Sequence, residues 1–172
     1  MSILTRDEIL KEIAAGHIKI DPYDPAAVGP ASVDLRLGSE FRVFRKARQV
    51  IQVTEETDYE TVTQKVQVTD GLMLMPAETV LGITLEQITL APQLCGWLEG
   101  RSRFARLGLL VHVSASFMQP GIANKQCLEL SNFSPMPLVV TPGLPICQFI
   151  FQRTVGEARY MGRFRHQREE NF

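Results

Sequence analysis

Residues 94–113 read LCGWLEGRSRFARLGLLVHV and show the pattern on which the chain is built. Two apolar segments, 94–99 and 107–113, flank a basic connection in which three arginines fall within six positions. Short apolar runs separated by polar turns are typical of strands in an antiparallel sheet. The arginines fit either a solvated turn, the common meaning of a short basic pattern, or a pocket for a ligand with several negative charges.

The remainder of the chain repeats this alternation after one helical segment. Thr5 and Glu8 have the spacing of a capping box, and the apolar periodicity after them predicts a helix over 6–15 that stops at Gly16. A second helix is expected only at 102–107, and 54–70 is expected to be an exposed polar loop or arm. Candidate strands cover 32–37, 41–44, 49–53, 71–75, 79–85, 94–99, 109–114, 126–133, 138–140 and 146–152. The pattern predicts one mostly β domain, an antiparallel sandwich or barrel.

Composition narrows the class of protein. The 172 residues include 18 Lys and Arg against 19 Asp and Glu, a net charge of −1, which gives no general attraction to a nucleic acid polymer or an anionic membrane. The first residues lack the apolar core of a signal peptide, and no apolar run is long enough for a membrane span, which predicts a cytoplasmic protein. The cysteines and histidines are too scattered for a zinc site or a disulfide framework: Cys95, Cys127, Cys147, His17, His112 and His166.

Glu129 is a candidate for acid–base chemistry, although its pattern alone favours a solvated glutamate. In QCLELSNF, a period of two puts Cys127, Glu129, Ser131 and Phe133 on one face of a strand and the leucines on the other. Beside Cys127 and Phe133 the carboxylate is expected to be partly desolvated, which suits a general acid or base. A solvated glutamate on an edge strand fits the same pattern.

The loop 114–125, SASFMQPGIANK, could bring backbone close to a ligand, and Gln119 could bond a base or a sugar there. An ordinary hairpin loop is the alternative. His112 lies in an apolar run and is expected to be a hydrogen-bonded core histidine, and Trp97 is expected to pack in the core or an interface.

The order of three motifs is more specific than any one of them. GPASVDLRLGSEFRVF (29–44), GWLEGRSRFARLGLLVHVSASFMQPG (96–121) and CLELSNFSPMPLVVTPGLPICQ (127–148) together resemble the dCTP deaminase family of the dUTPase-like superfamily, over almost the whole chain. The resemblance implies a distorted β-barrel and a homotrimer with active sites at subunit interfaces. It also implies hydrolytic deamination of dCTP to dUTP and ammonia without zinc, with Mg²⁺ held by the triphosphate rather than by protein ligands. The dUTP would supply dUMP and dTMP synthesis.

Residue roles follow from this resemblance position by position. Glu129 matches the catalytic glutamate, Ser102 and Arg106 match residues of the reaction centre, and Ala115 matches a backbone carbonyl that holds the water. The remaining matches are to substrate-binding positions: Arg101, Arg103, Phe104 and Ala105 in the arginine segment, Gln119, Cys127, Leu128 and Gln148 in the barrel, and Tyr160, Arg163 and Gln167 in the tail. The tail, about 160–172, is expected to be mobile until it closes over the nucleotide. Arg103 stands where the family has a small polar residue, and no chemistry is assigned to it.

Three departures affect the predicted chemistry. Gln119 replaces an acidic residue whose counterpart in dUTPases activates the water that attacks the phosphate chain, and glutamine cannot act as that base. Phe117 replaces an arginine and Asn124 a glycine, so the sugar and base pocket is expected to differ from that of other members. Two alternatives remain open: a dUTPase-like diphosphatase and a non-catalytic nucleotide-binding trimer.

Overall fold

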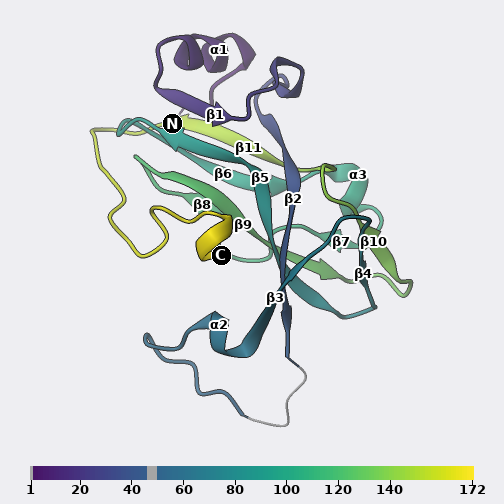
Figure 1. The fold of residues 1–172 in the computed structure, drawn as a ribbon. Helices are drawn as coiled ribbons and strands as arrows, with labels where there is room; N and C mark the ends of the chain where they lie inside the picture. The colour runs from purple at the N-terminus through teal and green to yellow at the C-terminus, as the bar shows by residue number, and fades with distance from the viewer. Residues whose placement is uncertain (1, 46–49) are drawn as a thin grey trace.

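Two long antiparallel strands, β2 (Val33–Phe44) and β5 (Thr79–Leu90), form the centre of the computed structural model, which describes residues 2–45 and 50–172 (Figure 1). Both strands alternate buried and more exposed side chains, as expected for a sheet with one face on the core. The other strands are β1 (Ile18–Asp21), β3 (Thr63–Gln67), β4 (Leu72–Leu74), β6 (Leu94–Gly100), β7 (Leu109–Leu110), β8 (Phe117–Met118), β9 (Ala123–Asn132), β10 (Leu138–Val140) and β11 (Pro145–Arg153).

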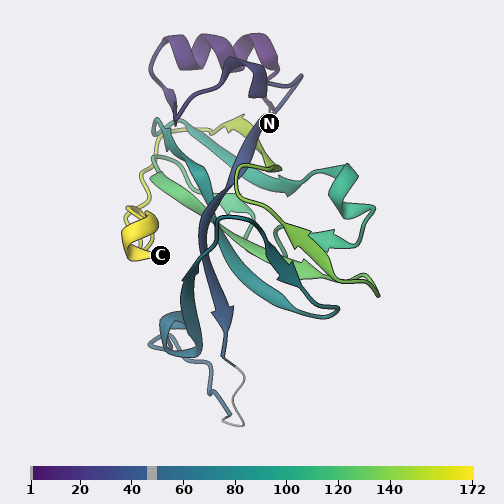
Figure 2. The same ribbon diagram turned by 45° about the vertical axis from the view of Figure 1, so that its right-hand side comes forward.

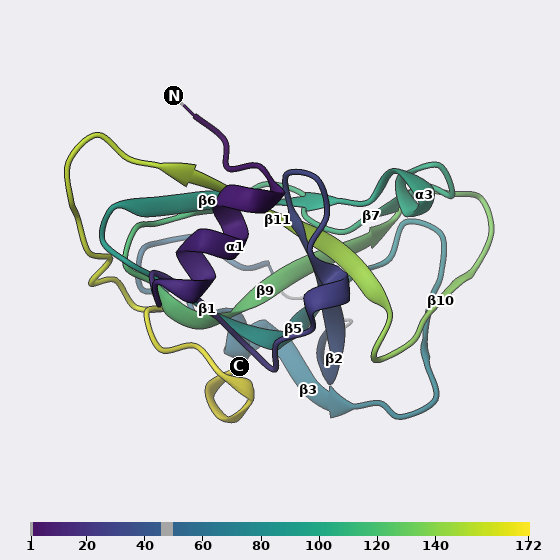
Figure 3. The same cartoon turned by 90° about the horizontal axis from the view of Figure 1, so that it is seen from above.

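The main sheet is antiparallel throughout and strongly curled. Its strands follow the order β7-β9-β5-β2-β11-β6-β8, with β1 added to β5 and β3 added to β2, while β10 and β4 form a separate pair. Figures 2 and 3 show the curl of the sheet from two further directions. The core of the protein consists mainly of aliphatic and phenylalanine side chains. The predicted fold class, a distorted antiparallel β-barrel with short helices, is confirmed.

The helices are short and lie at the ends of the sheet. Helix α1 (Arg6–Ala14) covers one end next to β1, and α2 (Tyr59–Val62) lies on an arm at the opposite end (Figure 1). Helix α3 (Ser102–Ala105) forms one turn after β6, and the 3-10 turns η1 (Pro25–Ala27) and η2 (Glu169–Asn171) complete the set. No helix among the described residues has the length and apolarity to cross a membrane.

The helix predicted at 6–15 is confirmed, but its predicted capping box is wrong. Thr5 is the N-cap residue by position, yet its side chain makes no capping hydrogen bond. Glu8, the other half of the expected box, instead pairs with Lys11 at 2.6 Å and with Arg153 of β11 at 3.1 Å. An ion pair to the sheet thus replaces the local bond that the sequence spacing indicated.

Several strand boundaries differ from the prediction. The segments predicted at 32–37 and 41–44 are one strand, β2, with a register shift between Leu37 and Phe41. Gly38 permits this, because a Cβ there would lie 2.8 Å from the Ile83 carbonyl oxygen of β5. The strand predicted at 49–53 is absent over 50–53, and Gln49 lies outside the described residues.

The predicted polar arm has more structure than the sequence indicated. Residues 54–67, here called the arm, contain α2 and the strand β3, which pairs with β2 from Glu40↔Gln67 to Phe44↔Thr63. The sequence did not predict β3, because most of its residues are polar. They are polar because β3 extends the edge of β2 and is not a core strand. The short strands β1 and β8 were not predicted either.

Candidate active site

Strand β9 carries Glu129, and the chain before Ala115 fixes its carboxylate. Glu129 Oε2 accepts hydrogen bonds from the backbone N–H of Val113 at 2.9 Å and of Ser114 at 2.8 Å, and the Ser114 hydroxyl donates to Oε1 at 3.2 Å. The strand predicted at 109–114 is shorter, since β7 covers only Leu109–Leu110, and the N–H groups of Val113 and Ser114 bond a side chain instead of a neighbouring strand. Donors aimed at a half-buried carboxylate hold it in one orientation.

The carboxylate borders two cavities. One, of about 530 Å³, is lined by the predicted site residues Ala115, Gln119, Cys127, Tyr160 and Gln167 together with Glu129. The other, of about 770 Å³, is lined by Glu129 together with Val113, Ser114 and residues 133–135. We call the first the nucleoside pocket, because the family resemblance predicts that its residues from the loop, from β9 and from the tail contact the nucleotide.

The tail closes the nucleoside pocket by pairing with β9. Lys125 N–H donates to the Gln167 carbonyl at 2.9 Å, and the Gln167 side chain donates back to the Lys125 carbonyl at 3.1 Å. The Asn124 side chain donates to the Phe164 carbonyl at 2.8 Å, and Lys125 Nζ lies 2.6 Å from Glu169. Asn124, which replaces a glycine of the family, therefore anchors the tail.

Cys127 lies beside Glu129 on the wall of this pocket but is unsuited to nucleophilic chemistry. Burial, and next the neighbouring Glu129 carboxylate, raise the pKa of the Cys127 thiol to about 12, against the smaller opposing effect of Arg42. The thiolate is the nucleophilic form of cysteine, so a thiol of this pKa is inert near neutrality. Of these two neighbours on β9, Glu129 is the one suited to proton transfer near neutrality.

Arg101 belongs to a second group of residues, at the junction of β2, β6 and β11. Its guanidinium lies 2.9 Å from Asp34 and donates to the Pro145 carbonyl at 2.7 Å. Gln148 of β11 is next to it, accepting from the Ser32 hydroxyl at 3.0 Å and donating to the Gly100 carbonyl at 3.4 Å. Sequence reasoning missed Asp34, although it lies in the VDLRLG motif that contributed to the resemblance.

Burial raises the pKa of the Asp34 carboxyl, and the nearby Arg101 and then Arg103 oppose that rise. A partly desolvated carboxylate beside two guanidinium groups is a candidate proton acceptor at an anion-binding site. Arg103, to which no chemistry was assigned, thus contributes positive charge at Asp34.

Helix α3 presents the remaining predicted residues away from Glu129. Arg101 is its N-cap, Ser102 its first residue and Arg106 its C-cap, and neither cavity beside Glu129 is lined by any of these three. Phe104 packs against the core, and the Ala105 N–H donates to the Arg101 carbonyl at 3.1 Å. Within one chain, the predicted site is therefore split between the nucleoside pocket and the Arg101 group.

Three other predicted residues have specific positions. The Leu128 side chain is fully buried on the core side of β9, so only its backbone is available to a ligand. Arg163 is ion-paired with Asp58 of the arm. His112 was expected to be hydrogen-bonded, and this is wrong, because both ring nitrogens are buried without a hydrogen-bond partner among the described residues.

Comparison with known proteins identifies the family. The family model described as dCTP deaminase-like matches residues 3–154. The chain belongs to the dCTP deaminase-like family. It is 40% identical over 159 residues to a protein of Salinispora arenicola named "dCTP deaminase, dUMP-forming", with 92% of this chain and 83% of the relative covered. A protein of the same name from Mycolicibacterium paratuberculosis is 41% identical over 160 residues, with 92% and 84% covered.

A solved structure supports the fold. The crystal structure of 2'-deoxycytidine 5'-triphosphate deaminase from Agrobacterium tumefaciens matches 88% of this chain with a TM-score of 0.70 and 23% sequence identity. The present chain covers 48% of that longer chain, about half its length.

The names of the relatives correct one prediction. The resemblance implied dUTP as the final product, whereas these relatives are named for the formation of dUMP. The dUTP product was implied by the resemblance, and Gln119 argued against phosphate cleavage; Asp34, a carboxylate next to Arg101, was not considered.

Proposed function

We propose that this protein converts dCTP and water to ammonia and a uracil nucleotide. The observation that carries the proposal is the Glu129 carboxylate, fixed by the Val113 and Ser114 N–H groups at the edge of a pocket lined by Ala115, Gln119 and Gln167. The names of relatives about 40% identical to this chain support the choice of dCTP.

Glu129 is the general base and acid of the proposed reaction. It takes a proton from a water that attacks C4 of cytosine, and it then delivers that proton to the amino nitrogen, which leaves as ammonia. The Ala115 carbonyl lies in the same pocket wall and is proposed to orient the water. Because one water enters and one ammonia leaves, the nucleotide product of this step is dUTP.

The proposed route uses no zinc. Many nucleobase deaminases activate water with zinc held by histidine and cysteine. The described residues hold no group of three or more His, Cys, Asp or Glu side chains that could bind a metal ion. We propose that Arg106 and Ser102 stabilise the charge that develops on the ring instead, as preorganised donors do in other active sites.

We infer that a second copy of the chain supplies Arg106 and Ser102. In one chain these residues of α3 line neither cavity beside Glu129, whereas deamination needs a cation there. A homotrimer with three identical interfaces gives each Glu129 the α3 of a neighbour. Exposed Phe117, which packs on Trp97 at a centroid distance of 5.6 Å, and exposed Phe133 support a buried interface on this side.

The triphosphate is proposed to bind at the Arg101 group. The Arg101 fork matches phosphate oxygens, and Gln148 adds an amide donor. Mg²⁺ fits this arrangement through the triphosphate oxygens, because the described residues offer no protein ligand set of their own. Its contribution would be to neutralise the phosphate charge.

We propose dUMP as the released product, in agreement with the names of the relatives. A second water then attacks the α-phosphorus of dUTP, and diphosphate leaves. Gln119 cannot deprotonate that water, so we assign this task to Asp34, whose carboxylate lies at the Arg101 group. The dUMP would be available for thymidylate synthesis. The free thiols of Cys95, Cys127 and Cys147 support a reducing compartment such as the cytoplasm.

Parallel incubations with dCTP and with dUTP, each with Mg²⁺, test the proposal. A deaminase of the proposed kind releases ammonia from dCTP and diphosphate from dUTP. Diphosphate from dUTP without ammonia from dCTP would show a dUTPase-like diphosphatase. Retention of dCTP in equilibrium dialysis without any product would show a non-catalytic binder.

A further inference from the structure

The arm brings a tyrosine into the nucleoside pocket. Tyr59, the first residue of α2, lines the same cavity as Glu129, Gln119 and Gln167, although it lies 70 positions before the glutamate in the chain. No residue of the arm took part in the predicted site. The strand β3 positions α2 there, because it pairs with β2 and returns the arm to the mouth of the pocket.

The Tyr59 ring is held on two sides. The Arg42 guanidinium lies 5.1 Å from the ring centroid, and it is itself fixed by a 3.1 Å bond to Thr63 and a 3.2 Å ion pair with Glu60. Phe164 of the tail packs against the ring with a centroid distance of 6.4 Å and an interplanar angle of 53°. A ring fixed by a buried cation and a second aromatic group loses little further entropy when a ligand binds.

The Tyr59 hydroxyl is available to a ligand. It makes no hydrogen bond to the protein among residues 2–45 and 50–172, although a polar group on a half-buried wall ordinarily has a partner. Burial is the main cause that raises the pKa of the phenol, so the hydroxyl is a neutral donor near pH 7.

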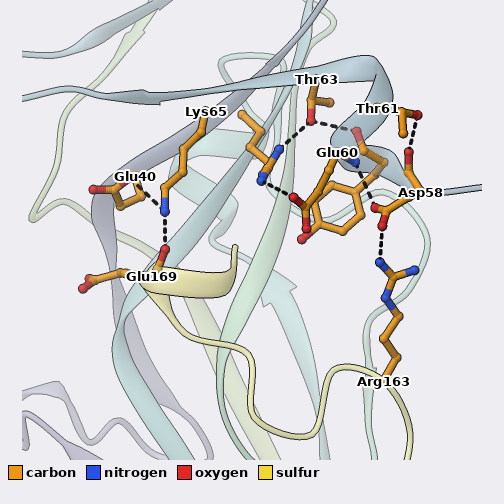
Figure 4. A network of polar contacts seen from close by, with 10 residues as sticks. Glu40, Asp58, Glu60, Thr61, Thr63, Lys65, Arg163 and Glu169 are labelled. Atoms are coloured by element: carbon orange, nitrogen blue, oxygen red, sulfur yellow. Dashed lines mark hydrogen bonds and ion pairs between the residues drawn. The ribbon is translucent and has the colours of Figure 1, made fainter.

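Ion pairs connect the arm to the tail. Figure 4 shows Arg163 reaching Asp58, the residue before Tyr59, and Lys65 of β3 between Glu40 and the Glu169 backbone. Phe164, which follows Arg163, is thereby held next to Tyr59. The arm and the tail form one side of the pocket together, and Tyr59 is the residue of the arm that lines it.

We propose that Tyr59 is a substrate-contacting residue that binds the nucleoside end of the nucleotide. Its ring packs against the nucleoside, and its hydroxyl donates a hydrogen bond to a nucleoside oxygen. The inference depends on the proposed function, because it assumes that a cytosine nucleotide occupies the pocket. It differs from a merely structural role, in which Tyr59 would only hold the tail in place.

Binding of dCTP to chains that also carry Glu129→Gln tests the proposal, because these chains allow affinity to be measured without turnover. Titration calorimetry would compare Tyr59→Phe, Tyr59→Leu and the matched control Tyr23→Phe, an exposed tyrosine outside the pocket. We expect dCTP affinity to fall about fivefold in Tyr59→Phe from loss of one hydrogen bond, and about 20-fold in Tyr59→Leu from loss of the ring as well. Inorganic tripolyphosphate, which has no nucleoside, should bind all variants equally.

The steady-state kinetics of chains that carry the same Tyr59 substitutions but keep Glu129 provide the second readout. KM for dCTP should rise by the same factors while kcat stays within about twofold. Unchanged dCTP affinity in both Tyr59 variants would overturn the proposal. Equal weakening of tripolyphosphate and dCTP would also overturn it, since that result indicates displacement of the arm. A parent chain that neither binds nor converts dCTP would instead refute the proposed function.

Discussion

Replacing Glu129 with glutamine removes the proposed base while keeping its surroundings. The Val113 and Ser114 N–H groups both donate to Oε2, so a glutamine carbonyl oxygen can accept both bonds. The new amide group would face the Ser114 hydroxyl, which can accept a hydrogen bond as well as donate one. We therefore expect the free energy of unfolding to change by less than about 1 kcal/mol.

The effect on turnover should be far larger than the effect on stability. General acid–base catalysis contributes about 10²- to 10⁴-fold, and Glu129 is proposed to be both base and acid in this reaction. We expect kcat for ammonia release to fall by about 10³-fold, or about 4 kcal/mol in the barrier. The affinity for dCTP should stay within about tenfold, because no phosphate contact is removed.

The assay is ammonia release from dCTP at saturating substrate, together with calorimetric titration of dCTP into the variant. Glu78→Gln is a suitable control, because the Glu78 carboxylate also accepts a hydrogen bond from a backbone N–H, that of Met75 at 2.8 Å. The Glu78 side chain lines neither of the two cavities beside Glu129. Turnover at the parental rate in Glu129→Gln would refute the proposed mechanism.

Three further predictions concern other parts of the site. Asp34→Asn should preserve ammonia release but cause dUTP to accumulate in place of dUMP, which anion-exchange chromatography would detect; unchanged dUMP formation would remove Asp34 from the second step. Arg106→Ala and Glu129→Gln chains should each be inactive alone. Co-assembled as random trimers they should regain about one quarter of parental activity, because a quarter of the interfaces then combine an intact Glu129 with an intact Arg106 of the neighbour. No recovery in a verified mixed trimer would contradict a site shared between copies. At pH 8 the raised pKa of about 12 leaves the Cys127 thiol protonated, so iodoacetamide should modify it at least about 100-fold more slowly in the folded protein than in urea. Peptide mass mapping would locate the label, and rapid labelling of Cys127 in the folded chain would contradict this.

The sequence was sufficient to predict the elements that have local periodicity. Apolar spacing predicts helix α1, the short strand β10 and the central parts of β5, β6, β9 and β11, because each of them buries one regular face. The two faces of β9 also follow, with Leu128 and Leu130 in the core and Glu129 at the pockets. Glu129 lines both cavities, and its catalytic role stays a prediction.

The missed features depend on contacts between distant segments. Strand β3 is mostly polar because it only extends the edge of β2. The end of the strand predicted at 109–114 lies outside β7, and its Val113 and Ser114 N–H groups bond Glu129 of β9. Tyr59 and Asp34 carry no local signal for their positions, since the pairing of the arm with β2 and of β2 with β11 places them. The capping box at Thr5 was wrong for the same reason, because Glu8 bonds Arg153 of a remote strand.

The most direct test of the central claim is a single-turnover reaction of dCTP with excess protein and Mg²⁺, stopped at successive times. Ammonia, dUTP, dUMP and diphosphate would be quantified in each sample. The structure and the proposed roles of Glu129 and Asp34 predict one ammonia and one diphosphate for each dUMP formed, with ammonia release not lagging behind diphosphate release. Unchanged dCTP, or diphosphate released while the cytosine ring remains intact, would contradict the claim that this pocket is a deaminase active site.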